Sequence, residues 1–168
     1  SAQAQQDHLD RMSGGTVAAS SVPGLNEVHP AVPSPPFVSV IIPTAGAAND
    51  QGRFVDAAVA SLRERESSVP LEITAVTTGE ISPIDGVDTQ VVVQPPFNFS
   101  RAINTGRHHS RGEFLFLLND DTSVDSDQPV LRLIEMASDP RVGVVGALLT
   151  YPDGRIQHAG IVMLPTGP

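Results

Sequence analysis

The chain has 168 residues, of which 40% are hydrophobic and 17% charged; this is enough for one ordinary domain with a core and too little for two. It has no cysteine and all ten of its basic residues are arginine, which excludes disulfides, thiolate nucleophiles, cysteine-bound zinc, a P-loop lysine and Schiff-base chemistry. The net charge of −9 without a basic stripe argues against nucleic acid as a partner, and no apolar run approaches the roughly 18 residues that cross a bilayer.

The N-terminal part differs in composition and periodicity from the rest of the chain. Residues 1–12 predict a short helix that is stopped by Gly14 and Gly15. The following "VPGLNEVHPAVPSPP" carries five prolines and predicts an extended linker, so residues 1–36 are expected to form a helix and a proline-rich connector. The chain starts at Ser1 with no signal segment, and we expect it to be part of a longer multidomain protein.

From Phe37 onward, apolar runs rich in β-branched residues alternate with segments of helical periodicity. In chain order the predicted elements are strand 37–43, helix 53–66, strands 71–76 and 89–93, a helix from Ser100 as N-cap to about His109, strand 113–118, helix 127–138, strand 142–149, a turn at 151–154, and a final strand in "RIQHAGIVM". This alternation predicts an α/β fold with a mostly parallel sheet covered by helices on both faces.

The strand at 113–118 runs directly into Asn119, Asp120 and Asp121. In parallel α/β sheets, ligands bind beyond the carboxyl ends of the strands. Two adjacent carboxylates there repel each other unless a cation joins them, and oxygen ligands favour Mg²⁺ or Mn²⁺. The alternative is a solvated turn in which the aspartates cap backbone N–H groups, and the pattern by itself does not choose between the two.

An ordered set of motifs adds a resemblance. The segments "VSVIIPT", "PFNFSRAINTG", "RGEFLFLLNDDTSV" and "VGVVGALLTYPDGRIQHAG" together resemble a family-two glycosyltransferase with the Rossmann-like GT-A fold. They are most similar to the bacterial branch that builds rhamnose-containing and other surface polysaccharides. The resemblance implies that residues 37–168 form the nucleotide-sugar-binding part of such a domain, truncated before the acceptor-binding part.

The resemblance also implies roles for the acidic motif. In the family, its counterpart, the DxD motif, holds Mn²⁺ or Mg²⁺ on the diphosphate of a sugar nucleotide, and the metal neutralises the charge that develops on the leaving group. Asn119, Asp120 and Asp121 match this motif. Asp121 is the first choice as direct metal ligand, followed by Asp120.

Two further strand ends match the donor side of the family's site. Pro43, Thr44 and Ala45 correspond to the loop that touches the nucleotide, where a plain strand-ending turn is the alternative. At the end of the next strand the family commonly has an aspartate that binds the base or ribose, whereas this chain has Thr77. A hydroxyl is a weaker acceptor than a carboxylate, so this departure leaves the nucleotide affinity and the base open.

Arg101 and Asn104 match the segment that borders the donor in the family. Arg101 could pair with phosphate through two parallel hydrogen bonds, or form a surface ion pair; Asn104 could reach the nucleotide or the acidic motif. Phe97 and Phe99 are expected to pack in the core or in a lid. His158 is a candidate on the acceptor side, with a structural role as the alternative.

An inverting transferase needs a general base to deprotonate the acceptor hydroxyl. In the family this carboxylate lies well downstream, and we expect it beyond Pro168. The leading hypothesis is therefore the donor-binding fragment of a metal-dependent inverting glycosyltransferase, which transfers a sugar from a nucleoside-diphosphate sugar to a glycan acceptor in surface-polysaccharide synthesis. The resemblance implies a cytoplasmic location, with a peripheral position at the inner face of the membrane as a variant.

Two alternatives remain open. Thr77 and the missing acceptor part are also typical of a degenerate, non-catalytic domain that serves as a structural or protein-binding module. A sugar-phosphate nucleotidyltransferase shares the alternating pattern but requires a basic residue in the loop after the first strand, and "PTAGAAND" has none.

Overall fold

The computed structural model describes residues 1–12, 14–20, 22–32 and 34–161. Contacts divide the chain into two compact units: the sheet unit, Ser34–Leu131, and the terminal unit, made of the segments before Ser34 and after Leu131. The start of the sheet unit nearly coincides with the predicted domain start at residue 37. The residues after Leu131, however, group with the N-terminal segment, and the assignment of 37–168 to one domain stays a prediction.

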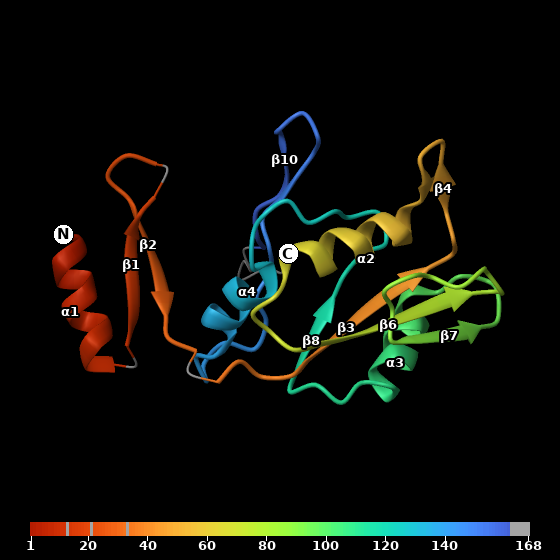
Figure 1. Cartoon of the computed structure of the whole chain (residues 1–168), viewed down its shortest axis with the longest axis horizontal. Helices are drawn as coiled ribbons and strands as arrows, with labels where there is room; N and C mark the ends of the chain where they lie inside the picture. The colour runs from red at the N-terminus through yellow and green to blue at the C-terminus, as the bar shows by residue number, and fades with distance from the viewer. Residues whose placement is uncertain (13, 21, 33, 162–168) are drawn as a thin grey trace, which may run out of the picture. The chain divides into compact units, whose positions relative to one another are not determined.

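The sheet unit contains a four-stranded sheet in which all strands are parallel (Figure 1). In spatial order the strands are β7 (Thr89–Val93), β6 (Leu71–Thr78), β3 (Val38–Thr44) and β8 (Phe114–Leu117). The chain begins in β3, moves outward to β6 and β7, and then returns to the other side of β3 to form β8. The strand order therefore reverses between β3 and β8, and in open α/β sheets this switch point is where ligands bind.

Two helices flank this sheet on opposite sides, α2 (Phe54–Arg65) and α3 (Phe99–His108) (Figure 1). The loop before α2 holds a short hairpin, β4 (Ala48–Asn49) with β5 (Gly52–Arg53), where the sequence predicts only a loop. The predicted N-cap of α3 is wrong by two residues. Asn98, not Ser100, caps the helix, because its side-chain oxygen accepts from the Arg101 N–H at 2.8 Å and satisfies a donor that the helix leaves unpaired.

The helix α3 packs closely on the central strands. Ile41, Val76 and Ala102 form a fully buried cluster. A methyl group at Gly106 would stand 2.4 Å from Ile41 Cγ2, so only glycine permits this approach. In the register Ile41 pairs with Leu117, yet Leu117 is 49% exposed, so α3 covers β3 and β6 but leaves this face of β8 open. The prediction that helices flank the sheet is confirmed, but the cover on this face is incomplete.

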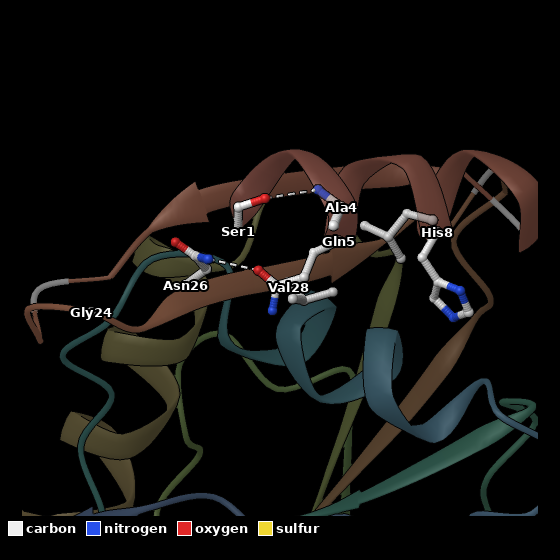
Figure 2. A pocket seen from close by; sticks show the side chains of 8 residues that line it. Ser1, Ala4, Gln5, His8, Gly24, Asn26 and Val28 are labelled. Atoms are coloured by element: carbon white, nitrogen blue, oxygen red, sulfur yellow. Dashed lines mark hydrogen bonds between the residues drawn. The ribbon is translucent and has the colours of Figure 1, made fainter.

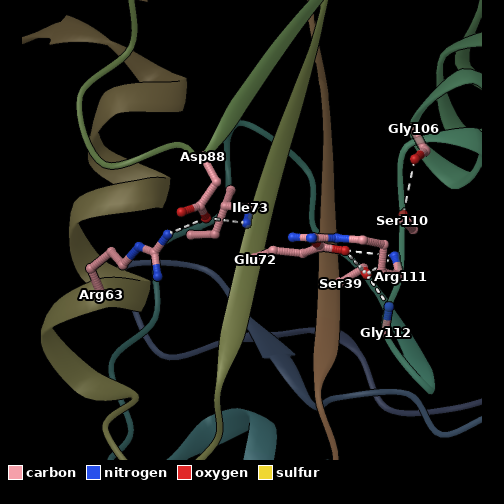
Figure 3. A network of polar contacts seen from close by, with 9 residues as sticks. All are labelled: Ser39, Arg63, Glu72, Ile73, Asp88, Gly106, Ser110, Arg111 and Gly112. Atoms are coloured by element: carbon pink, nitrogen blue, oxygen red, sulfur yellow. Dashed lines mark hydrogen bonds and ion pairs between the residues drawn. The ribbon is translucent and has the colours of Figure 1, made fainter.

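A buried carboxylate joins three segments at the amino end of the sheet (Figure 3). Glu72 accepts from the Ser39 hydroxyl at 2.6 Å and from the Arg111 backbone N–H at 2.6 Å, and its other oxygen accepts from the Arg111 side chain at 2.7 and 3.0 Å. The Ser39 oxygen in turn accepts from Gly112 N–H at 2.7 Å. Burial raises the pKa of Glu72, but the hydrogen bonds from Ser39 and Arg111 outweigh it and hold that pKa below its usual value.

A second buried carboxylate caps α4 (Pro129–Ala137). Glu66 follows α2 directly, and one of its oxygens accepts from the backbone N–H groups of Val130 and Leu131 at 2.9 and 3.1 Å. Its other oxygen accepts from two backbone N–H groups just after it in the chain. A negative charge is favourable at a helix N-terminus, so Glu66 ties the end of α2 to the start of α4.

The terminal unit begins with α1 (Ala2–Met12), as the sequence predicts. The expected extended linker is wrong in one respect: the segment is extended, but it pairs with itself as an antiparallel hairpin of β1 (Gly15–Ala19) and β2 (Asn26–Pro30). The hairpin is tied to α4 through His29, whose Nδ1 lies 3.0 Å from Glu135 Oε2 and 2.8 Å from Arg132 Nη1. Pro23 lies in the turn between the two strands, and Pro30 is the last residue of β2, an edge strand, where proline is tolerated.

The predicted strand at 142–149 does not form. Residues 142–148 are irregular, and Val144 and Leu148 are 90% and 63% exposed. Only β9 (Leu149–Thr150) follows, paired with β10 (Ile156–His158) across the predicted turn. The reason is that a strand needs a partner for its backbone groups, and an apolar run does not specify one. The last predicted strand is confirmed at 156–158, and its residues beyond 161 lie outside the described part.

Candidate functional site

The switch point between β3 and β8 brings the acidic motif against the end of the central strand. Ile41 and Leu117 are register partners, and the pairing continues because the Leu118 N–H donates to Ile41 O at 3.1 Å. Three residues later on each strand, the Thr44 hydroxyl donates to Asp120 Oδ2 at 2.5 Å. A buried hydroxyl and a half-buried carboxylate thus meet where α/β sheets bind ligands.

The Thr44 hydroxyl is held on both sides. Thr44 is 1% exposed, and its oxygen accepts from the Gly46 N–H at 2.9 Å while its proton goes to Asp120. Gly46 has a φ of +76°, which residues with a side chain rarely adopt, and a Cβ at this position would stand 3.0 Å from Ile81 Cγ2. The glycine therefore allows the loop after β3 to turn its N–H back onto Thr44.

The rest of the acidic motif faces solvent. Asn119 and Asp121 are exposed, and the Thr122 N–H donates to Asn119 O at 3.3 Å, which closes a turn. Across the part of the chain that the structure describes, no backbone N–H donates to the carboxylate of Asp120 or Asp121. The alternative in which both aspartates cap backbone groups therefore finds no hydrogen bond to support it.

The donor set suits a hard divalent cation that is shared with a ligand. Asp120 and Asp121 offer carboxylate oxygens and Asn119 an amide oxygen, the donors that Mg²⁺ and Mn²⁺ prefer. Among residues 1–12, 14–20, 22–32 and 34–161, no group of three or more histidine, aspartate or glutamate side chains gathers as a metal cage. Mg²⁺ in phosphate sites needs no such cage, because one or two carboxylates, water and phosphate oxygens complete its shell.

The other predicted strand-end residues lie at the same edge, with different exposure. Pro43 and Thr77 are buried and Ala45 is exposed. The Thr77 hydroxyl donates to Gly79 O at 3.0 Å within its own turn. The neighbouring Thr78 hydroxyl is buried without a partner among the described groups, a feature that sequence reasoning missed and that no sequence signal marks.

The segment before α3 also reaches this edge, because it follows the carboxyl end of β7. Arg101 is exposed, and its Nη2 donates to the backbone oxygens of Gln94 and Pro96, so the side chain shapes its own loop. Asn104 is exposed on the next turn of the helix. Phe97 and Phe99 are each 47% exposed, so they do not pack in the core, and the alternative expectation that they pack in a lid stays a prediction.

Two remaining features belong to the terminal unit. His158 is half-buried at the end of β10. An open groove of about 570 Å³ lies between α1 and the hairpin and is lined by residues such as Gln5, His8 and Asn26 (Figure 2). A hydrogen bond of 2.6 Å from Asn26 to Gln5 crosses it, and its lining includes no carboxylate. The groove therefore offers none of the acidic chemistry found at the β3–β8 edge.

Comparison with known proteins gives relatives of much greater length. The chain is 35% identical over 173 residues to the uncharacterized protein y4gI of Sinorhizobium fredii, covering 95% of this chain and 19% of that protein. It is 31% identical over 169 residues to the O-antigen biosynthesis protein RfbC of Myxococcus xanthus, covering 98% of this chain and 13% of that protein. The chain thus spans less than a fifth of these relatives, and no family model matches it.

Among solved structures, the chain matches a mannosyltransferase, PcManGT of Pyrobaculum calidifontis in complex with GDP-Man and Mn²⁺. The TM-score is 0.52 with 18% identity, and the match covers 84% of this chain and 41% of the mannosyltransferase. The chain therefore has the Rossmann-like GT-A fold of glycosyltransferases, which confirms the predicted fold class. More particularly, it is a relative of bacterial proteins that include one of O-antigen biosynthesis, as the sequence resemblance implies.

Proposed function

We propose that this chain is the donor-binding part of a metal-dependent, inverting glycosyltransferase that acts in cell-surface polysaccharide synthesis. The observation that carries the proposal is the hydrogen bond from Thr44 to Asp120, which fixes a carboxylate at the switch point of a GT-A sheet. The RfbC relative supports polysaccharide synthesis as the process, and the mannosyltransferase neighbour supports a nucleotide sugar as the donor. The acceptor would be a glycan.

The residues at this edge of the sheet have different proposed roles. Asp120 and Asp121 would hold the divalent ion, which supplies positive charge for the leaving diphosphate. Arg101 shapes the loop before α3 through its bonds to Gln94 and Pro96. That loop and Asn104 border the space where the nucleoside would lie. An inverting transferase also needs a general base, and we assign that role to no residue of this chain, so the activity that we propose for the chain is donor binding.

The identity of the donor's sugar and nucleotide base needs separate evidence. The neighbour holds GDP-mannose, which makes GDP the first nucleotide to test, followed by UDP and dTDP. The buried Thr77 hydroxyl is already bonded within its turn, so a base or ribose contact from this strand end is not expected of its side chain. Among the described helices none is long and apolar enough to span a membrane. The cytoplasmic location implied by the resemblance stays a prediction.

Calorimetric titration of the chain with each nucleotide, with and without Mn²⁺, tests the proposal. We expect nucleotide binding that requires Mn²⁺ and that is weakened in Asp121→Ala. The matched control is Asp125→Ala, which removes another exposed carboxylate four residues away. Binding that is insensitive to metal, or equally weakened by both substitutions, would contradict the metal role of the motif.

A non-catalytic module is the second candidate, and the structure of Thr77 favours it: the family's carboxylate is replaced by a hydroxyl that is turned into the protein. The same titration separates the two candidates. Absence of heat with all three nucleotides in the presence of Mn²⁺ supports the module. Sustained sugar transfer by this chain to a glycan acceptor would instead contradict our expectation that it only binds donor.

A further inference from the structure

We propose that Thr44 is a positioning residue that fixes Asp120 as the principal metal-holding carboxylate, and that its side chain does not contact the nucleotide. This inference rests on the proposed function, and it reverses the order of the two aspartates expected from the sequence. It also changes the role of Thr44, which the resemblance places among the residues that touch the nucleotide.

The argument begins with the hydrogen-bonding capacity of a hydroxyl. Threonine has one proton to donate, and here that proton goes to Asp120 Oδ2 at 2.5 Å. The Thr44 oxygen accepts from the Gly46 N–H at 2.9 Å, and the residue is 1% exposed. The hydroxyl therefore has neither a spare proton nor a solvent-facing side for a nucleotide.

The hydrogen bond from Thr44 occupies one carboxylate oxygen of Asp120 and leaves the other available to bind an ion. Oδ2 is bound to the buried hydroxyl, and the half-buried carboxylate is thereby held in one orientation with Oδ1 left for an ion. The chain of bonds from Gly46 through Thr44 to Asp120 is cooperative, because each donor polarises the next. Such partners around a metal ligand orient it before the metal arrives.

Asp121 has no comparable support. It is exposed, and within the described residues no side chain or backbone group donates a hydrogen bond to its carboxylate. An exposed carboxylate on a turn loses conformational freedom when it binds an ion, whereas Asp120 has already lost it in the folded protein. Asp120 thus provides the fixed point of the site and Asp121 the adaptable one.

The test measures Mn²⁺ affinity by electron paramagnetic resonance titration of the 168-residue chain in the presence of GDP, UDP or dTDP. We expect Thr44→Val to weaken Mn²⁺ binding about 10- to 100-fold, the usual effect of losing a partner of a metal ligand. Thr44→Ser keeps the hydroxyl and should restore most of the affinity. In an Asp120→Asn background, Thr44→Val should have little further effect.

A matched control is Thr74→Val, which removes a buried hydroxyl from the neighbouring strand away from the acidic motif and should leave Mn²⁺ affinity unchanged. Far-UV circular dichroism checks that each variant is folded; if Thr44→Val is not, Thr44→Cys takes its place, because a thiol is a weak donor. Wild-type affinity in a folded Thr44 variant would overturn the inference while the proposed function stands. If the wild-type chain binds no Mn²⁺ with any of these nucleotides, the proposed function fails and this inference with it.

Discussion

Replacing Glu72 by alanine probes how the amino end of the sheet is held together. The side chain is 8% exposed and joins β6 to Ser39 of β3 and to Arg111 of the loop before β8 (Figure 3). The substitution leaves the Ser39 hydroxyl and the Arg111 backbone N–H without their carboxylate acceptor. We expect the sheet unit to lose stability without losing its fold.

The magnitude follows from the exposure of each partner. Each buried donor that loses its acceptor costs about 1–3 kcal/mol. The Arg111 N–H keeps a second, longer bond of 3.1 Å to the Ser39 oxygen, which places its cost at the low end. The Arg111 side chain is 78% exposed and returns to water, so its ion pair adds at most about 1 kcal/mol. The free energy of unfolding should therefore fall by about 2–4 kcal/mol.

Urea denaturation followed by far-UV circular dichroism measures this change, since the chain has no tryptophan for fluorescence. Arg111→Ala is the control that removes only the exposed partner and should cost at most about 1 kcal/mol. The hydrogen bonds lower the pKa of Glu72 below its ordinary 4.5, so its contribution is complete above pH 4.5 and is lost as the pH falls through the folded-state pKa. The reasoning would be refuted if Glu72→Ala and Arg111→Ala lowered the free energy of unfolding equally. It would also be refuted if the stability difference between wild type and Glu72→Ala did not shrink as the pH falls below 4.5.

Three further predictions concern single contacts. Glu66→Ala should cost about 1–3 kcal/mol in urea denaturation, because the first N–H groups of α4 lose their carboxylate cap, whereas Glu64→Ala, which removes an exposed carboxylate from the last turn of α2, should cost little; similar losses in both would contradict the capping role. Gly106→Ala should lower the free energy of unfolding by about 1–3 kcal/mol, since its methyl group would stand 2.4 Å from Ile41 Cγ2, and an unchanged denaturation midpoint would show that α3 can move away. The side-chain and backbone hydrogen bonds from Arg141 lower the pKa of Asp139 to about 2, and in an NMR titration Arg141→Ala, which keeps only the backbone bond, should raise that pKa toward 3.8; a pKa that stays near 2 would exclude the Arg141 side chain as the cause.

Much of the sheet unit follows from local sequence. The β-branched runs at 38–44 and 71–78 and the apolar periodicity at 54–65 specify elements whose type is set within a few residues, and their order specifies a parallel sheet. Because parallel strands in such a sheet end at a common edge, the sequence also places the acidic motif at the edge where ligands bind.

The choice of partners was made only by the tertiary structure. Nothing in the sequence around Thr44 indicates that its proton goes to Asp120, 76 positions away, nor that the Thr77 hydroxyl turns into its own loop. The proline-rich segment pairs with itself, and the apolar run at 142–148 finds no strand to pair with in the described chain. Propensity and periodicity act over neighbouring residues, whereas a hydrogen-bond partner is chosen by the packing that brings distant segments together.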